Sequence, residues 1–158
     1  MAERVWLTGR TFFRHYADKH EVLFAGSGEL QDLFVRAVAE GLESAAPIDA
    51  LAVGLDALSE LFADRREFAR KRQAVILANR ELRERELIKL ASLSAALADT
   101  LGRHGIAEPA ASLTAEVGIA AFRVGFERWI AAEEDRGMAE LMRESLDGLK
   151  AVTSGRCG

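Results

Sequence analysis

Cysteine is almost absent from this sequence of 158 residues, which contains only Cys157, one position before the last residue. A single cysteine cannot form an internal disulfide bond, and no group of cysteines and histidines has the spacing of a structural zinc site. A chain of this length, close to that of one domain, buries about two thirds of its extended-state surface on folding. We therefore predict a fold that is held by its own core and binds no metal ion.

Proline is also scarce, because Pro47 and Pro109 are the only two, and the alternation of β-branched and polar residues that marks strands is missing. Alanine, leucine, glutamate and arginine, all strong helix formers, dominate the sequence instead. No apolar run reaches the roughly 18 residues that a transmembrane helix needs. These absences predict an all-α protein without a membrane span.

The sequence also lacks a large excess of either charge, since it contains 21 basic and 25 acidic residues and has a net charge of −4. This balance excludes a generally basic coat for nucleic acid, although it permits a local basic surface. The first twenty residues carry charges throughout, from Glu3 and Arg4 to Asp18 and Lys19, which is unlike a secretory signal. We expect a soluble, cytoplasmic protein with no membrane partner.

Patterns for catalysis and cofactor binding are also absent from the sequence. The three histidines, His15, His20 and His104, form no evident constellation with acids or nucleophiles. There is no Glu-x-x-His pair of the di-iron type, no His-Glu-x-x-His motif and no glycine-rich phosphate loop after a strand. We predict that the protein is not an enzyme and has no cofactor.

What the sequence does contain is a succession of apolar residues at spacings of three and four, which is typical of amphipathic helices. Asp18 and Glu21 form a capping-box-like start, Asp64 is a candidate cap, and His104-Gly105 is a typical helix end. The helices predicted from these signals cover about residues 18–44, 47–62, 64–76, 80–103, 109–130 and 138–152.

Residues 1–25 carry the most distinctive pattern in the chain. A short helix-compatible segment, a turn candidate at Leu7–Gly9 and a second short helix over about residues 10–16 follow one another there. Phe12 and Tyr16 lie four residues apart and therefore share one face of the second helix, where they can anchor it in a core. The polar side chains of this helix then lie largely on its outer side.

The run from Thr8 to Phe24 resembles the helix-turn-helix of the TetR family of bacterial transcriptional regulators. It has a cap residue, a threonine, two aromatic residues, His15 and a further aromatic residue, followed by Asp18-Lys19 at the start of a hydrophobic helix. The aromatic-rich segment Phe122–Trp129 resembles the family's penultimate helix less sharply. The resemblance implies a partial DNA-binding head at residues 1–25, continued as a connecting helix to about residue 44. It also implies a helical effector-binding and dimerisation domain at residues 46–153.

The same resemblance implies which residues contact DNA. Positions that clamp the DNA backbone in the family match Thr11, Phe13, His15 and Lys19 of this sequence. Positions nearer the bases match Thr8 and Arg10, and the guanidinium groups of Arg10 and Arg14 can read guanine edges or bind phosphate. The expected DNA-binding residues are therefore Thr8, Arg10, Thr11, Phe13, Arg14, His15 and Lys19.

Two features differ from the family pattern. The family has a complete helix before the segment that Met1–Trp6 represents here, and Trp6 stands where a glycine is usual in the turn. Either the true product is longer, or the chain is a shortened regulator. The first alternative implies a ligand-responsive transcriptional regulator, a repressor that binds operator DNA as a homodimer. The second implies a shortened dimerising or small-molecule-binding module without operator binding of its own.

For the helical body, the resemblance implies a dimer seam on the last two helices and a ligand pocket among the others. The candidate seam residues are Ala120, Ala121, Val124, Leu141, Met142, Leu146 and Leu149. The candidate pocket residues are Leu55, Leu58, Phe62, Leu87, Phe122 and Phe126. The apolar pocket set favours a small hydrophobic effector, although periodicity separates neither set from ordinary intramolecular core.

A local basic surface is predicted at residues 65–89, which contain nine basic and four acidic residues and so carry a net charge of +5. One interpretation is a binding site for phosphate or for an acidic effector. The other is a solvated helix face on which charges of opposite sign pair between neighbouring turns.

Overall fold

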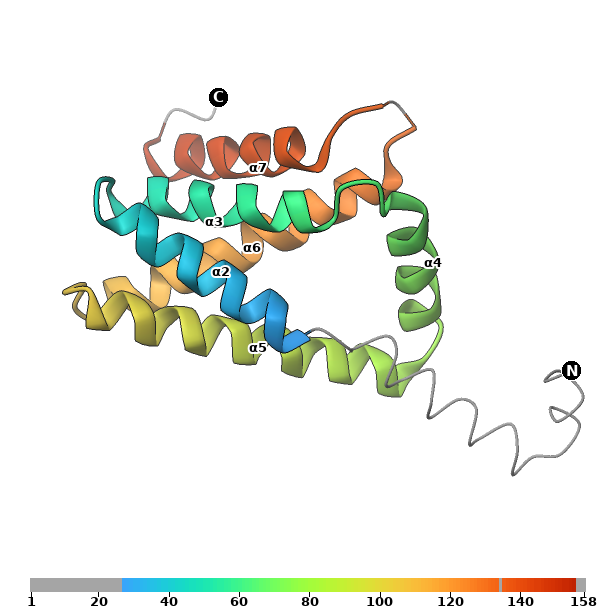
Figure 1. Cartoon of the computed structure of the whole chain (residues 1–158), viewed down its shortest axis with the longest axis horizontal. Coiled ribbons are helices and arrows are strands. Elements are labelled where there is room, and N and C mark those ends of the chain that lie inside the picture. The colour runs from blue at the N-terminus through green and yellow to red at the C-terminus, as the bar shows by residue number, and fades with distance from the viewer. Residues whose placement is uncertain (1–26, 134, 156–158) are drawn as a thin grey trace, which may run out of the picture.

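The computed structural model describes residues 27–133 and 135–155 of the chain, and these residues form an all-α fold. Figure 1 shows their six helices wound into one bundle. The helices are α2 (Ser27–Leu42), α3 (Pro47–Leu61), α4 (Arg66–Leu77), α5 (Arg80–Arg103), α6 (Ala110–Ala131) and α7 (Met138–Thr153). The all-α fold class predicted from the sequence is thus confirmed for the described part of the chain.

Local sequence signals set most of the helix ends. Helix α3 begins at Pro47, and α5 begins after Asn79, whose side-chain Oδ1 accepts a hydrogen bond of 3.0 Å from the backbone N–H of Leu82. Helix α5 ends at Arg103, and the chain turns at Gly105 with a φ of 92° that glycine adopts readily. The prediction that Asp64 caps α4 is wrong, because Asp64 lies one residue before the N-cap position and takes a positive φ of 63° in the turn.

The core lies between α2, α3, α5, α6 and α7, and leucine and phenylalanine side chains without solvent exposure fill it. Two glycines of α6 allow its neighbours to come close. A Cβ atom at Gly118 would lie 2.9 Å from Leu51 of α3, and one at Gly125 would lie 2.7 Å from the Sδ atom of Met142 of α7. The close packing of α3 and α7 against α6 therefore depends on the absence of a side chain at these two glycines.

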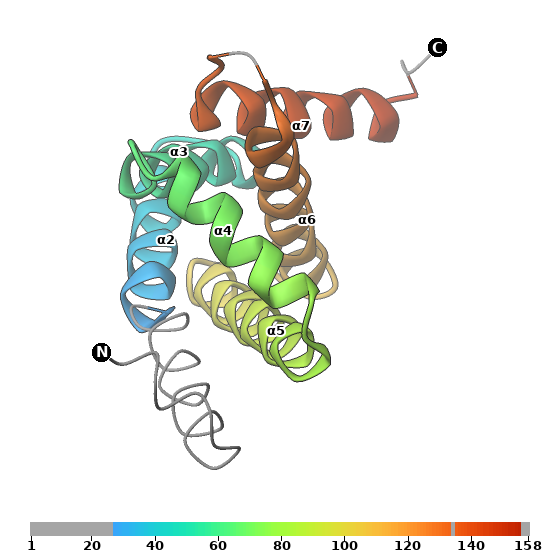
Figure 2. The same ribbon diagram turned by 90° about the vertical axis from the view of Figure 1, so that its right-hand side faces the viewer.

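Helix α4 stands apart from the other five in orientation. In Figures 1 and 2 it crosses one end of the bundle, between the end of α3 and the start of α5, and passes α6 on the way. Its neighbours are α5 and α6, whereas α7 packs on α3 and α6 on the opposite side from α5. The crossing of α4 over the end of the bundle creates the cavity considered below.

Several expectations fall on residues 1–26 or on the final residues, which lie outside the described part of the chain. They include the head at residues 1–25 and its DNA-binding residues Thr8, Arg10, Thr11, Phe13, Arg14, His15 and Lys19. In the part that is described, no helix has the length and apolar character needed to cross a membrane. The same residues contain no group of three or more histidine, cysteine or acidic side chains placed to hold a metal ion.

Candidate functional site

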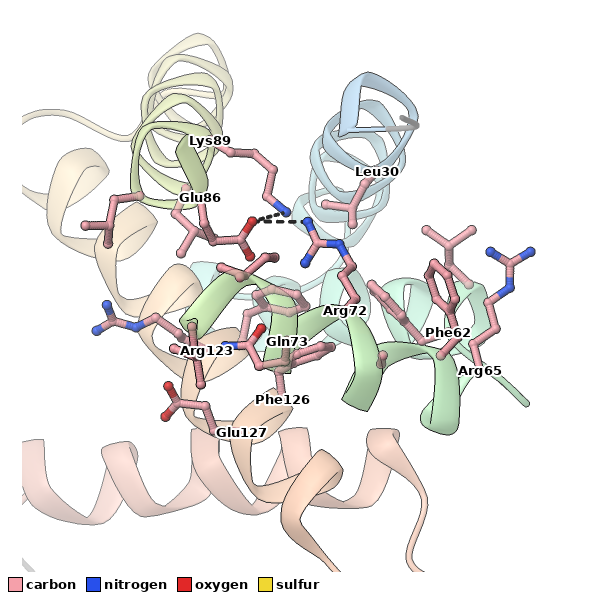
Figure 3. A pocket seen from close by; sticks show the side chains of 18 of the residues that line it. Leu30, Phe62, Arg65, Arg72, Gln73, Glu86, Lys89, Arg123, Phe126 and Glu127 are labelled. Atoms are coloured by element: carbon pink, nitrogen blue, oxygen red, sulfur yellow. Dashed lines mark hydrogen bonds and ion pairs between the residues drawn. The ribbon is translucent and has the colours of Figure 1, made fainter. Parts of the chain in front are cut away.

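A cavity of about 490 Å³ lies where α4 crosses the ends of α2, α5 and α6 (Figure 3). Its volume is within the range of about 300–1,000 Å³ that is typical of small-molecule sites. Helix α4 provides one wall, α5 and α6 provide the others, and Leu30 of α2 points in from the side. The site is therefore assembled from α2, the end of α3, the consecutive helices α4 and α5, and α6.

The apolar wall of the cavity is aromatic. Phe122 and Phe126 lie one turn apart on α6, with ring centroids separated by 5.8 Å, and Phe62 at the end of α3 packs 6.5 and 5.7 Å from them. Trp129 supports this cluster from behind, 6.3 Å from Phe62 and 5.9 Å from Phe126. Tilted and edge-to-face contacts of this kind add to the burial energy and hold the wall in place.

The mouth of the cavity is also apolar, which is unusual for a surface region. Phe68 and Leu77 of α4 and Leu87 of α5 line the cavity, yet each is more than half exposed to solvent. Deeper in the cavity, Ile76 of α4 and Leu90 of α5 are buried. Contiguous exposed apolar side chains beside a hollow are typical of surfaces that bind an apolar partner or ligand.

A group of three charged side chains interrupts this apolar lining. The Oε1 atom of Glu86 lies 3.2 Å from Nη2 of Arg72 and 3.1 Å from Nζ of Lys89. The side chain of Arg72 is only 13% exposed, and those of Glu86 and Lys89 are each 20% exposed. Figure 3 shows Arg72 reaching from α4 and Lys89 reaching along α5 toward the same carboxylate. We refer to these three residues as the charged triad.

Burial and charge act against each other in the charged triad. Burial raises the pKa of Glu86, but the nearby charges of Lys89 and Arg72 outweigh it, so that the pKa lies below the ordinary value of a glutamate. Burial lowers the pKa of Lys89 and Arg72 lowers it further; Glu86 only partly opposes them, so the pKa lies below the ordinary value of a lysine. The charged form of Glu86 is thus favoured over that of an ordinary glutamate, whereas the charged form of Lys89 is less favourable than that of a lysine in water.

On the neighbouring face of α4, two arginines hold the C-terminal end of α6. The guanidinium of Arg66 donates to the carbonyl oxygens of Trp129 at 2.9 Å and Ala132 at 2.6 Å. The guanidinium of Arg70 donates to those of Ile130 at 2.5 Å and Ala132 at 2.7 Å. Carbonyls at a helix end lack partners within the helix, and cations near them are stabilising. We refer to Arg66 and Arg70 as the arginine clamp.

The structure divides the candidate pocket residues into two groups. Phe62, Leu87, Phe122 and Phe126 line the cavity. Leu55 and Leu58 do not, because they lie on the inner face of α3 and are buried in the core.

The basic residues of the stretch 65–89 also form two groups, one pointing inward and one exposed, and the sequence analysis did not separate them. Arg72 and Lys89 point inward, whereas Lys71, Arg80 and Arg85 are exposed. The spacing of α4 contains a signal for this, since Arg72 lies three residues after Ala69 and four before Ile76, both of which are buried. The interpretation as a solvated face describes Lys71, Arg80 and Arg85, whereas the binding of phosphate or an acidic effector stays a prediction.

Four of the seven candidate seam residues lie inside the chain itself. Ala121, Leu141, Met142 and Leu146 are buried where α6 packs against α7 and the core, so a second copy cannot reach them. Leu149 is half-buried, and Ala120 and Val124 are exposed. The same two helices carry two further exposed apolar residues that the candidate seam did not include, Leu113 on α6 and Val152 on α7.

Comparison with known proteins agrees with this architecture. Residues 45–154 match the family described as the MftR C-terminal domain, so that the match spans 110 of the 158 residues, from residue 45 to residue 154 inclusive. The matched range includes α3 to α7 and therefore most of the cavity lining, the charged triad and the arginine clamp. No curated protein matches the sequence.

Proposed function

The chain belongs to the TetR family of transcriptional regulators, and from that premise we propose that it is a ligand-responsive repressor that binds operator DNA as a homodimer. The observation that carries the proposal is the cavity of about 490 Å³ in the matched domain, with its wall of aromatic side chains. A small molecule that fills this cavity is the effector in this proposal, and its apolar body lies against Phe62, Phe122 and Phe126. Binding of the effector releases the operator.

The arrangement of α4 supports a mechanism for that release. One face of α4 lines the cavity, and the adjacent face carries the arginine clamp on the end of α6. An effector that binds one position of α4 better than another shifts the population toward that position, and the clamp carries the shift to α6 and α7. In a dimer built on these helices, such a shift changes the separation of the two DNA-binding heads.

A stripe of exposed apolar side chains along α6 supports the homodimer. Leu113, Ala120 and Val124 follow one another at spacings of seven and four residues, with half-buried Val117 between the first two. Leu113 is 62% exposed and Val124 is 46% exposed. This spacing places all four side chains on one face of the helix, where the same face of a second copy can cover them.

The dimer has a direct test. Val124→Glu places a charge in the proposed seam and should convert a dimer to a monomer in size-exclusion chromatography with light scattering. Ile88→Glu is the matched control, because Ile88 is 69% exposed on α5, away from the stripe. A Val124→Glu variant that keeps the mass of the unmodified dimer would contradict this seam.

DNA binding in this proposal belongs to Thr8, Arg10, Thr11, Phe13, Arg14, His15 and Lys19. The test is a titration of the DNA upstream of the encoding gene over a series of salt concentrations. Several phosphate contacts predict a steep loss of affinity as salt rises. Lys19→Ala should weaken binding to all sequences alike, whereas Arg10→Ala should change the preference between sequences. Equal effects of both substitutions would contradict these roles.

The alternative is a dimerising and small-molecule-binding module that does not bind an operator by itself. The matched domain, residues 45–154, supports this alternative, because it contains most of the cavity lining and the exposed apolar stripe of α6, which are the features that such a module needs. The same titration separates the two. A preference for the upstream DNA over an unrelated duplex of equal length favours the repressor, and equal, weak binding to both duplexes favours the module.

A further inference from the structure

We propose that the effector is an organic carboxylic acid with an apolar body, and that Arg72 and Lys89 bind its carboxylate. This inference rests on the proposed function, because it names the chemical class of the molecule that the cavity binds. The apolar body lies against the aromatic wall, and the carboxylate joins or replaces that of Glu86 between the two cations. The sequence alone indicated a small hydrophobic effector for the pocket and, as one of two interpretations of residues 65–89, a site for phosphate or an acidic effector; it did not bring the two together.

The geometry of the charged triad is the first support for this class of ligand. One carboxylate oxygen of Glu86 lies within 3.2 Å of both cationic groups, which come from two different helices. The two cations are therefore already arranged around a carboxylate, inside the cavity and largely shielded from water (Figure 3). A ligand carboxylate that enters the same space meets donors whose positions are set before it binds.

The charge of the lining is the second support. The described lining contains five basic residues, Arg65, Arg72, Arg83, Lys89 and Arg123, and three acidic ones, Glu29, Glu86 and Glu127. The lining thus carries an excess of two positive charges. An anion that is desolvated in this cavity is attracted by that excess, whereas a cation of the same shape is repelled and a neutral molecule gains nothing from it.

The distribution of the two kinds of lining sets the shape of the ligand. Phe62, Phe122 and Phe126 form one continuous apolar wall, and Ile76 and Leu77 extend it along α4. The charged triad is at the α4–α5 side of this wall, as Figure 3 shows. The site therefore fits a molecule with an extended apolar part and one anionic end.

The experiment compares three probes with the same phenylhexyl body: 6-phenylhexanoate, 6-phenylhexan-1-ol and 6-phenylhexylamine. Binding to the full chain is measured by isothermal titration calorimetry at neutral pH. We expect the carboxylate to bind about tenfold more tightly than the alcohol, which is the effect of one charge-assisted hydrogen bond, and the amine to bind most weakly. Equal affinities for the carboxylate and the alcohol would overturn the proposal.

Variants separate ligand binding from a purely structural role of the charged triad. Arg72→Met with Lys89→Met removes both charges but keeps apolar stems of similar length, so the preference for the carboxylate should disappear while the affinity for the alcohol stays. Arg80→Met is the matched control, because Arg80 lies on α5 with its side chain 85% exposed and should leave the preference unchanged. Loss of the preference in the control, or its survival in the double variant, would overturn the assignment.

A second variant keeps the proposal testable if the double variant does not fold. Glu86→Gln leaves both cations in place and removes the carboxylate that competes with the ligand, so it should strengthen binding of 6-phenylhexanoate several-fold and leave the alcohol unaffected. A weaker or unchanged affinity for the carboxylate would contradict the proposal. If none of the probes binds, the carboxylate assignment fails, while the repressor proposal is still decided by the DNA titration, which needs no ligand.

Discussion

Removal of the arginine clamp should destabilise the fold in a characteristic, non-additive way. Arg66 and Arg70 each donate to two carbonyl oxygens at the end of α6, and both donate to that of Ala132. When one arginine is replaced by alanine, the other still satisfies Ala132, so only one carbonyl loses its arginine donor. When both are replaced, the carbonyls of residues 129, 130 and 132 lose theirs together.

The size of the effect follows from the kind of bond and its exposure. A hydrogen bond to a charged group contributes about 1.5–3 kcal/mol when it is shielded from water. The clamp is only partly buried, since the side chain of Arg70 is 40% exposed, so we expect about 1–2 kcal/mol for each single alanine variant. The shared acceptor predicts that the double variant loses about 0.5–1 kcal/mol more than the sum of the two single variants.

The assay is urea unfolding followed by circular dichroism, at one protein concentration because the stability of the proposed dimer depends on that concentration. Lys71→Ala is the matched control, since Lys71 lies on the same helix and is exposed. Glu67→Ala removes the 3.5 Å ion pair between Glu67 and Arg70 and measures how much that pair contributes. Single clamp variants as stable as the control, together with strict additivity in the double variant, would refute the reasoning.

Two further effects on stability follow from the structure. The pKa of Glu86 is lower in the folded state than in the unfolded state, so the ionised carboxylate stabilises the fold at pH values above the unfolded pKa. This stabilisation is lost as the pH falls through the folded pKa. Glu86→Gln should therefore make the free energy of unfolding depend less on pH on the acid side. A Cβ atom at Gly125 would lie 3.1 Å from the backbone Cα atom of Met142, so Gly125→Ala should destabilise by about 1–3 kcal/mol in thermal unfolding. Gly148→Ala, which has no neighbour within 4 Å in the middle of α7, should instead stabilise by about 0.5–1 kcal/mol, and the opposite order would contradict the packing described.

The fold could be predicted from the sequence because its signals are local. Pro47 and Gly105 mark helix boundaries through their own backbone chemistry, which needs no knowledge of the tertiary structure, and Asn79 is a further local signal of this kind that the prediction did not use. The spacing of apolar residues then gives the inner face of each helix. Where a local signal was misinterpreted, at Asp64, the residue takes part in the turn rather than capping the helix.

The site was only partly predictable, because it depends on which helix lies opposite a given face. Leu58 lies in the last turn of α3 and Phe62 is its C-cap residue, four positions later, yet Leu58 lies in the core and Phe62 lines the cavity under α4. Their own sequence neighbourhood does not distinguish them. Only the crossing of α4, which is set by tertiary packing, makes one of them a cavity residue.

The candidate seam residues could also be predicted only in part, because an apolar helix face can pack either within the chain or against another chain. Helix α7 has a single apolar stripe, in which Met138, Leu141, Met142 and Leu146 are buried, and the chain uses that stripe for its own core. Helix α6 has two, an inner one that includes Phe122 and an outer one at Leu113, Ala120 and Val124. Counting the apolar stripes of each helix, rather than listing its apolar residues, therefore separates the intramolecular core from an exposed apolar face such as the proposed seam.

The two roles that we propose for α4 follow from its helical spacing. Arg66 and Arg70 are four residues apart and share one face, and Ala69 and Ile76 point from the adjacent face toward the cavity. A helix of twelve residues moves largely as a unit, so α4 cannot yield to a ligand without displacing the donors that hold the end of α6. In the proposed mechanism the coupling between the two sites is reciprocal, so we expect that loosening the clamp changes the affinity of the cavity for a ligand by the same factor by which that ligand changes the clamp.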